Sequence, residues 1–272
     1  MMFLLCIGFI QQAYSQSSSS DNSPHPFHIN YWLTGTILGV GSVANYLGTP
    51  GVQRKAELSL WEIQELNKSD VHGIDAWALK QDPTHRGTFF NYSNYALWST
   101  LALPASLLFD RRIRRDLFDM VLMYLETITI ATNIYEWSFL GPNFQERMRP
   151  ITYYDQVPYD ERKQGDNRSS FFSGHTTSAA ATTFFLVKVF SDYHPEIGND
   201  KYLLYGAALI PPLLVGYFRI KALMHFPSDV LVGLGVGALC GVLIPEFHRW
   251  KDKNISFDVW ASSRSSGIGM KW

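Results

Sequence analysis

Seven residues in three short stretches of the sequence are of the types that bind and transfer a phosphoryl group. In chain order they are Arg149, then Ser173, Gly174 and His175, and finally Arg219, His225 and Asp229. Guanidinium groups match phosphate oxygens in charge and in geometry. A histidine can attack a reacting centre or move a proton there. Two arginines, two histidines and an aspartate together predict a phosphate-binding catalytic site.

The first stretch is Arg147-Met148-Arg149-Pro150. An arginine beside a proline presents its fork of donors on a rigid turn, which suits a phosphate. An arginine that only anchors a loop at a membrane edge is an equally good interpretation of this stretch. The stretch alone does not decide between the two.

The second stretch, Ser173-Gly174-His175, opens a predicted helix. Glycine lets a ligand approach the backbone closely, and the first N–H groups of a helix are unpaired and attract anions. A phosphate is therefore expected to bind the Gly174 N–H and the Ser173 hydroxyl, with His175 beside it. The alternative is that Ser173 only caps the helix and His175 is an interfacial polar residue.

The third stretch runs from Arg219, at the end of one apolar segment, to His225 and Asp229 at the start of the next. Residues four apart can meet on a helix, so Asp229 is expected to accept a hydrogen bond from Nδ1 of His225. That bond would leave Nε2 free as a nucleophile. A metal held by this pair is the competing chemistry, but it needs further ligands, and the nearby arginines repel cations. We expect neither a metal nor another cofactor.

Six apolar segments must position these residues. Each has 16–19 residues, close to the ~20 that a helix needs to cross a bilayer. They are 31–47, 92–109, 117–135, 173–190, 202–218 and 230–245. Pro211-Pro212 predicts a kink in the fifth segment. The predicted fold is all-α, a bundle of about six mostly transmembrane helices, and a soluble bundle is the alternative.

Basic residues indicate how the bundle is oriented. Arginines crowd the loop 111–115, and the flank 248–253 is also basic. Short basic loops stay in the cytoplasm, which predicts that the loops 140–172 and 222–227 face outward. The three stretches then share the external face. We expect an integral protein of a bacterial inner membrane with its active site on the periplasmic side.

The remaining chain divides into a leader, a linker and a tail. Residues 1–15 predict a signal peptide, although a short apolar start without Lys or Arg is also consistent with no cleavage. Residues 16–28 predict a flexible linker, 29–250 the membrane domain and 251–272 a tail without assignable chemistry. If the leader is cleaved, the new N-terminus lies outside, and the segment 31–47 must then return without crossing or not span the membrane at all. If the leader is not cleaved, six crossings agree with the basic loops.

Composition limits the partners of the chain. The net charge is −1 and the pI is near 6.7, which gives no electrostatic footprint for nucleic acid. Two cysteines exclude a disulfide framework and a cysteine-based zinc site. A mean hydropathy of −0.06 hides apolar blocks between polar loops. The composition indicates the bilayer as a partner, and the oligomeric state is not indicated.

With these motifs, residues 92–247 resemble the type 2 phosphatidic acid phosphatase family, which shares its site with vanadium haloperoxidases and bacterial acid phosphatases. The family's motifs are Lys-x6-Arg-Pro, Pro-Ser-Gly-His and Ser-Arg-x5-His-x3-Asp. The matching residues here are Arg149-Pro150, Ser173-Gly174-His175 after Phe172 in place of proline, and Arg219-x5-His225-x3-Asp229 after Phe218 in place of serine.

The resemblance implies metal-independent hydrolysis of a phosphate monoester or pyrophosphate of a membrane lipid. In it His225 attacks phosphorus, Asp229 orients His225, and His175 protonates the leaving group and then activates water. The phosphoryl oxygens are held by Arg149, Arg219, Ser173 and Gly174. A vanadate-dependent haloperoxidase, a catalytically weakened relative and a non-catalytic scaffold are the alternatives.

One position departs from the family's pattern. Pro142 stands where the first motif has lysine, and 137–145 resembles an insertion. A phosphate-neutralising cation is therefore missing. Arg147, Lys163 or Arg168 could replace it, and Arg168, five residues before Ser173, is the best placed.

Overall fold

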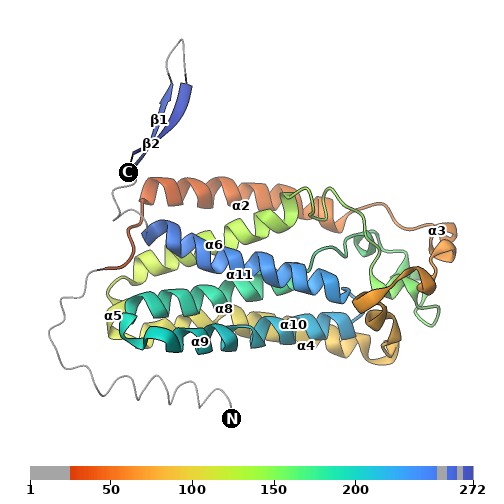
Figure 1. Ribbon diagram of the computed structural model, residues 1–272. Coiled ribbons are helices and arrows are strands. Elements are labelled where there is room, and N and C mark those ends of the chain that lie inside the picture. The colour runs from red at the N-terminus through yellow and green to blue at the C-terminus, as the bar shows by residue number, and fades with distance from the viewer. Residues whose placement is uncertain (1–24, 250–255, 262–265, 272) are drawn as a thin grey trace.

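The computed structural model describes residues 25–249, 256–261 and 266–271, and within them six long helical segments form a bundle (Figure 1). The segments are α2 (Tyr31–Gln53), α4 (Arg86–Leu101), α6 (Leu117–Trp137), α8 (Gly174–Tyr193), the pair α9 (Lys201–Ala208) and α10 (Ile210–Lys221), and α11 (Pro227–Arg249). The predicted all-α bundle is confirmed. The predicted kink is also confirmed, because the fifth segment breaks between α9 and α10, with Pro211-Pro212 in the first turn of α10.

Short elements connect the long helices. At the site end they are α3 (Leu60–Glu65), η1 (Lys68–Asp70), η2 (Gly73–Lys80), η3 (Pro83–His85), η5 (Pro150–Tyr153), α7 (Tyr159–Arg162) and η6 (Gly165–Arg168). At the other end they are η4 (Leu103–Phe109), α5 (Arg111–Arg114) and η7 (Pro195–Asp200). The strands β1 (Ser256–Ala261) and β2 (Ser266–Lys271) form an antiparallel hairpin that the sequence did not indicate.

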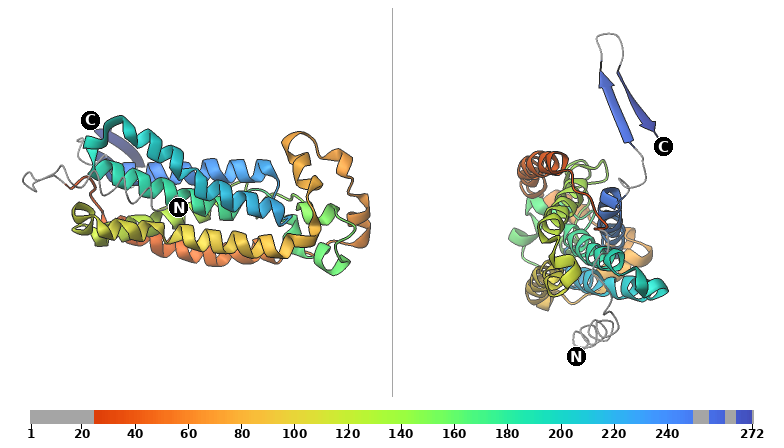
Figure 2. Two further views of the ribbon diagram at one scale, coloured as in Figure 1. Left: turned by 90° about the horizontal axis from the view of Figure 1, so that it is seen from below. Right: turned by 90° about the vertical axis from the view of Figure 1, so that its left-hand side faces the viewer.

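Helix α8 lies at the centre of the bundle and packs against α4, α6, α10 and α11 (Figure 2). Its middle consists of small residues, and α11 approaches it through glycines. A Cβ on Gly237 would overlap the carbonyl oxygen of Thr177, and one on Gly241 would meet that of Ala181 at 2.5 Å. The close approach fixes the start of α11 beside the start of α8, where the predicted site residues lie.

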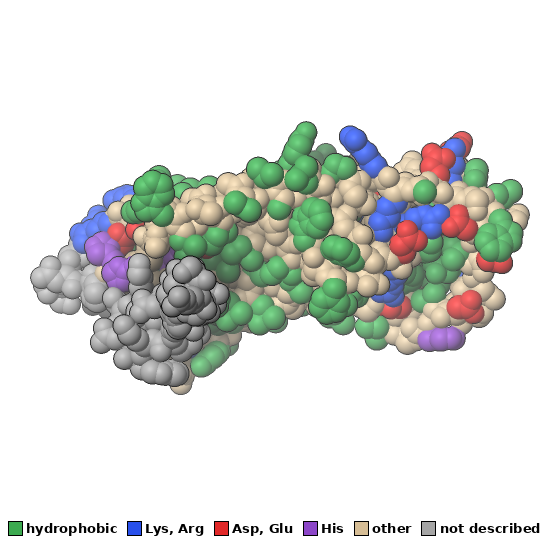
Figure 3. All heavy atoms as spheres, turned by 90° about the horizontal axis from the view of Figure 1, so that it is seen from above, with side chains coloured by type: hydrophobic (Ala, Val, Ile, Leu, Met, Phe, Trp, Pro, Cys, Tyr) green, Lys and Arg blue, Asp and Glu red, His purple; other side chains and the backbone are tan. Residues whose placement is uncertain are grey.

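The outer faces of the bundle are apolar. Hydrophobic side chains cover the middle of the surface, while charged side chains gather toward the two ends (Figure 3). In the described part of the chain, three helices are long and apolar enough to cross a membrane: Leu117–Trp137, Pro195–Lys221 and Pro227–Arg249. The chain is an integral membrane protein, as expected. These are the third, fifth and sixth predicted segments. The first and the fourth, now α2 and α8, are not among the three, and neither is the second, because α4 has 16 residues and continues as η4.

The two ends of the bundle differ as the basic loops predicted. The arginine-rich α5 and the end of α11 lie at one end, and the loops that carry the site lie at the other (Figure 1). Helix α2 starts at the α5 end, where the His28 N–H donates to the His248 carbonyl at 3.0 Å. It then runs the length of the bundle, so 31–47 does not turn back. The predicted signal peptide, 1–15, lies outside the described residues.

Replacing Gly237 with alanine should lower the free energy of unfolding by about 1–3 kcal/mol, because the new methyl would press on the α8 backbone. Gly235 is the matched control on the same helix, since nothing lies within 4 Å of its Cβ position. Gly235→Ala should be neutral or stabilising by about 0.5–1 kcal/mol. Thermal unfolding in detergent compares the two, and equal melting temperatures would contradict the packing described here.

Candidate active site

The N-terminus of α8 presents Ser173 and Gly174 to the site. Ser173 is the N-cap, and its Oγ accepts from the Thr176 N–H at 3.5 Å and from the Thr176 hydroxyl at 2.9 Å. The capping role considered from the sequence is therefore present. Both bonds use Oγ as an acceptor, so the Ser173 proton can still be donated to an anion. The Ser173 N–H donates to the carbonyl of Asp229 at 3.1 Å, which joins this helix start to α11.

His225 is buried, with 2% of its surface exposed, and its Nδ1 lies 2.6 Å from the carbonyl oxygen of Ser170. A carbonyl can only accept, so Nδ1 carries the proton and Nε2 keeps its lone pair. The predicted tautomer is present, but Nδ1 bonds to the Ser170 carbonyl, and the expected bond to Asp229 is wrong. The Asp229 Oδ2 is 3.7 Å from Nδ1, beyond hydrogen-bond length.

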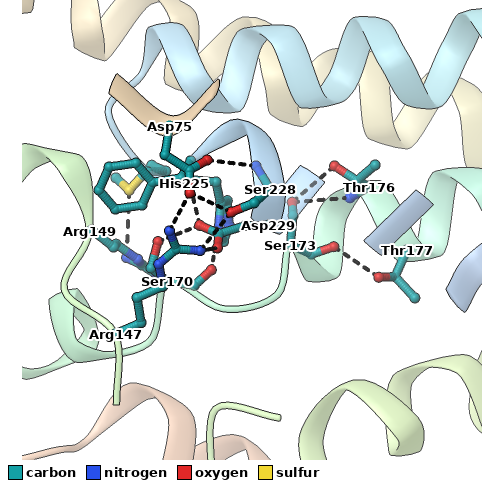
Figure 4. Close-up of polar contacts among 12 residues, drawn as sticks. Asp75, Arg147, Arg149, Ser170, Ser173, Thr176, Thr177, His225, Ser228 and Asp229 are labelled. Carbon is teal, nitrogen blue, oxygen red and sulfur yellow. Dashed lines mark hydrogen bonds and ion pairs between the residues drawn. The ribbon is translucent and has the colours of Figure 1, made fainter. Parts of the chain in front are cut away.

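Asp229 is held by other groups instead. Its Oδ2 accepts from the Ser170 hydroxyl at 2.6 Å and from the Phe226 N–H at 2.7 Å, so it caps its own helix. Its Oδ1 forms an ion pair with Arg147. Hydrogen bonds therefore connect Asp229 to His225 by way of Ser170, whose hydroxyl and carbonyl they use (Figure 4).

A second carboxylate, Asp75 of η2, completes this network. It accepts from Nη2 of Arg147 at 2.7 Å and from the N–H and hydroxyl of Ser228 at 2.9 and 2.7 Å. Arg147 also donates to the Ser228 hydroxyl at 2.8 Å. Arg147 thus pairs with both Asp75 and Asp229. It holds the start of α11 in place and does not replace the missing lysine (Figure 4).

Arg149 and Arg219 are both buried and both lack a full set of partners. Arg149 is 8% exposed and pairs through Nη1 with Asp166 at 2.6 Å, while its Nε has no hydrogen-bond partner. Arg219 is 4% exposed, and its Nη1 donates to the Ser93 hydroxyl at 3.4 Å. Its Nε also has no partner, and no described carboxylate lies within salt-bridge distance of it. Buried donors without acceptors are costly, and the two guanidiniums have the charge and the free donors to bind an anion.

The remaining predicted residue, His175, lies near the same groups. It lies within electrostatic range of Arg149, Arg219 and His225. Its Nε2 is 3.0 Å from Oδ1 of Asn94, a residue of α4. The structure therefore brings together both arginines, both histidines and the start of α8, as the three stretches predicted.

Arg168 is the exception. Its Nε donates to the Ala56 carbonyl at 3.0 Å, and its Nη2 pairs with Glu62 at 2.6 Å. The backbone N–H of Ser59 and then Arg168 lower the pKa of Glu62 to about 2. Arg168 thus holds the segment 54–65, so it was wrong to expect it at the phosphate. Lys163 is also engaged, with Asp160 at 3.1 Å.

Several residues of the site gave no sequence signal. Ser170 and Asn94 belong to no motif and are recognisable only once the helices are packed. Asp75 lies in a polar stretch far from the other residues in the sequence. Only Arg147 stood in a stretch already singled out, and its role there proved to be different.

Burial lowers the pKa of His225 to about 4, and the pair of arginines adds to the effect, whereas Asp229 opposes it. The ring should therefore remain neutral, with its proton on Nδ1, from pH 8 down to about pH 5. Nitrogen-15 NMR of histidine-labelled protein in detergent measures both the tautomer and the titration. A His225 midpoint near the ordinary 6.5, or a proton on Nε2, would contradict the described site.

Comparison with known proteins shows a family match. The sequence model of the PAP2 superfamily matches residues 120–253, which include all three stretches. The lipid A 4'-phosphatase of Porphyromonas gingivalis is 25% identical over 173 residues, 62% of this chain and 69% of that protein. The phosphatidylglycerophosphatase B of Bacillus subtilis is 28% identical over 170 residues, 61% of this chain and 72% of that protein. 

A solved structure is also similar. It is the crystal structure of a transmembrane PAP2-type phosphatidylglycerolphosphate phosphatase from Bacillus subtilis, with a TM-score of 0.44 and 20% identity. The alignment covers 81% of this chain and 96% of that one.

Proposed function

We propose that this chain, a membrane phosphatase that belongs to the PAP2 superfamily, hydrolyses a phosphate monoester or pyrophosphate of a lipid through a phosphohistidine. The observation that carries the proposal is the pair of buried guanidiniums, Arg149 and Arg219, whose Nε groups have no partner beside two histidines. A phosphoryl group supplies the acceptors that both arginines lack. The phosphatase names of both relatives favour hydrolysis over the haloperoxidase alternative.

In the first step, Nε2 of His225 attacks phosphorus and the bond from phosphorus to the leaving oxygen breaks. Burial lowers the pKa of His175 in the free site, and the negative charge of the bound phosphate favours its imidazolium form, which gives its proton to the leaving alkoxide. In the second step His175 takes a proton from water, which attacks the phosphohistidine and releases phosphate and free His225. Arg149 and Arg219 hold the equatorial oxygens, where negative charge is stabilised in the transition state.

The scaffold fixes the nucleophile through backbone and carboxylate contacts. The Ser170 carbonyl holds Nδ1 of His225, and Asp229 holds the Ser170 hydroxyl. When the Nε2–phosphorus bond forms, the imidazole becomes positive. Asp229, 3.7 Å away, stabilises that charge. The arginines supply the positive charge that neutralises the phosphoryl oxygens, so the proposed mechanism has no step for a metal.

The proposed substrate is a lipid whose phosphate reaches the membrane surface. The site lies at one end of the bundle, beside loops whose aromatic residues Phe139 and Phe144 are exposed, where rings favour the membrane interface. The basic end of the bundle is the opposite one, which supports a periplasmic site in a bacterial inner membrane. Lipid A phosphates and phosphatidylglycerophosphate, the substrates in the relatives' names, are the first candidates.

Phosphate release from these two lipids and from phosphatidic acid, measured with purified protein, tests the proposal. His225→Ala should lower the rate by at least about 10³-fold, and His175→Ala by about 10²–10⁴-fold, because each removes a reacting group. The matched control is His85→Ala, since His85 is exposed at the same end of the bundle. Activity should resist EDTA, and near-normal activity of His225→Ala would refute the mechanism.

Arginine substitutions separate the two kinds of cation near the site. Arg219→Gln should reduce kcat/KM by about 10²–10³-fold, as for other groups that stabilise transition-state charge. Arg168→Gln should leave kcat/KM within about threefold, because its guanidinium binds Glu62 and the Ala56 carbonyl. If both variants lost a similar share of kcat/KM at equal amounts of folded protein, Arg168 would have to act on the phosphate as Arg219 does.

A further inference from the structure

Tyr135, in the last turn of α6, covers the start of α8. A Cβ on Gly174 would lie 3.1 Å from Cε1 and from Cζ of the Tyr135 ring, so the ring lies against the backbone that is proposed to bind phosphate. Its other neighbour is Phe172, whose ring meets it edge-on with centroids 5.5 Å apart. Two contacts therefore fix the direction of the ring and of its hydroxyl.

The hydroxyl end of the Tyr135 ring lies at the start of α8, because Cζ, which carries the hydroxyl, is 3.1 Å from the Cβ position of Gly174. It lies within electrostatic range of both Arg149 and Arg219. In the part of the chain that the structure describes, no group forms a hydrogen bond with it. The side chain is partly buried, and a tyrosine hydroxyl that is withdrawn from water usually has such a partner. Tyr124 on the same helix follows the rule, because its hydroxyl donates to the Leu101 carbonyl at 3.0 Å.

Three donors thus lie near one another: the Tyr135 hydroxyl and the buried Nε groups of Arg149 and Arg219, which have no partner. The cations that could have replaced the absent lysine of the first motif are engaged elsewhere, Arg147 with Asp75 and Asp229 and Arg168 with Glu62. Tyr135, in the last turn of α6, brings its hydroxyl donor to the start of α8.

We propose, on the basis of the phosphatase function above, that Tyr135 is a catalytic residue whose hydroxyl donates a hydrogen bond to a phosphoryl oxygen. It supplies a hydrogen-bond donor to a site that lacks the lysine of the family's first motif. A phenol supplies a directed donor without a full positive charge, so binding of the phosphoryl group relies on Arg149 and Arg219 for charge and on Tyr135 for geometry.

Tyr135→Phe tests the proposal, because it keeps the ring that packs on Gly174 and Phe172 and removes only the hydroxyl. We expect kcat/KM to fall by about 10- to 100-fold and the inhibition constant of orthovanadate to rise by about tenfold. The melting temperature should stay unchanged. Tyr135→Lys, which restores a donor but not the ring, should recover part of the loss in kcat/KM relative to Tyr135→Phe.

Tyr124→Phe is the matched control, since it removes the hydroxyl of a tyrosine on the same helix that bonds to Leu101 and Thr182. It should lower the melting temperature and leave kcat/KM of the folded protein within about threefold. Wild-type kcat/KM and vanadate inhibition in Tyr135→Phe would overturn the role of Tyr135 alone. A wild-type protein that releases no phosphate from any lipid would instead reject the proposed function. The role of Tyr135 is then tested by calorimetry, which compares the binding of inorganic phosphate to wild type and to Tyr135→Phe. Equal affinity, or no binding to either protein, would count against that role.

Discussion

Asp229 is a fully buried carboxylate, and its contacts connect the segments from which the site is built. It accepts from the Ser170 hydroxyl and the Phe226 N–H, and it pairs with Arg147. These bonds join the loop before α8, the start of α11 and the segment after α6. A buried ion pair of this kind adds little net stability, but loss of either partner leaves an uncompensated charge in the interior. The pair therefore constrains how the loops meet, and the position of His225 follows from that constraint.

The site combines a satisfied half and an unsatisfied half. Behind His225, Asp75, Arg147 and Asp229 have partners on nearly every polar atom, which makes this side rigid. In front of it, Arg149 and Arg219 are close enough to repel each other and keep donors without acceptors. A protein interior tolerates such an arrangement where a ligand of opposite charge completes it. The unsatisfied groups are thus the ones proposed to bind the ligand, and the satisfied groups hold His225 in place.

The sequence could predict the parts of this protein that depend on local patterns. Apolar runs predicted the six helical segments, Pro211-Pro212 the break in the fifth, and motif spacing the meeting of His175, Arg219 and His225. It could not predict contacts that only packing creates. Asp229 was expected to contact His225 because it is four residues away, yet its carboxylate caps its own helix, and the Ser170 carbonyl takes that position. Arg168 is near Ser173 in the sequence, but its guanidinium binds the segment 54–65, which is distant along the chain. Asp75 and Tyr135 stand in no motif, and only the fold brings them to the site.

A structure of the protein with orthovanadate, which adopts the geometry of phosphoryl transfer, tests the central claim most directly. The claim is that the three stretches form one phosphate site with His225 as the nucleophile. Vanadium should then lie within bonding distance of Nε2 of His225, with both Arg149 and Arg219 donating to its equatorial oxygens. Vanadate bound away from Nε2 of His225, or held by only one of the arginines, would contradict the account.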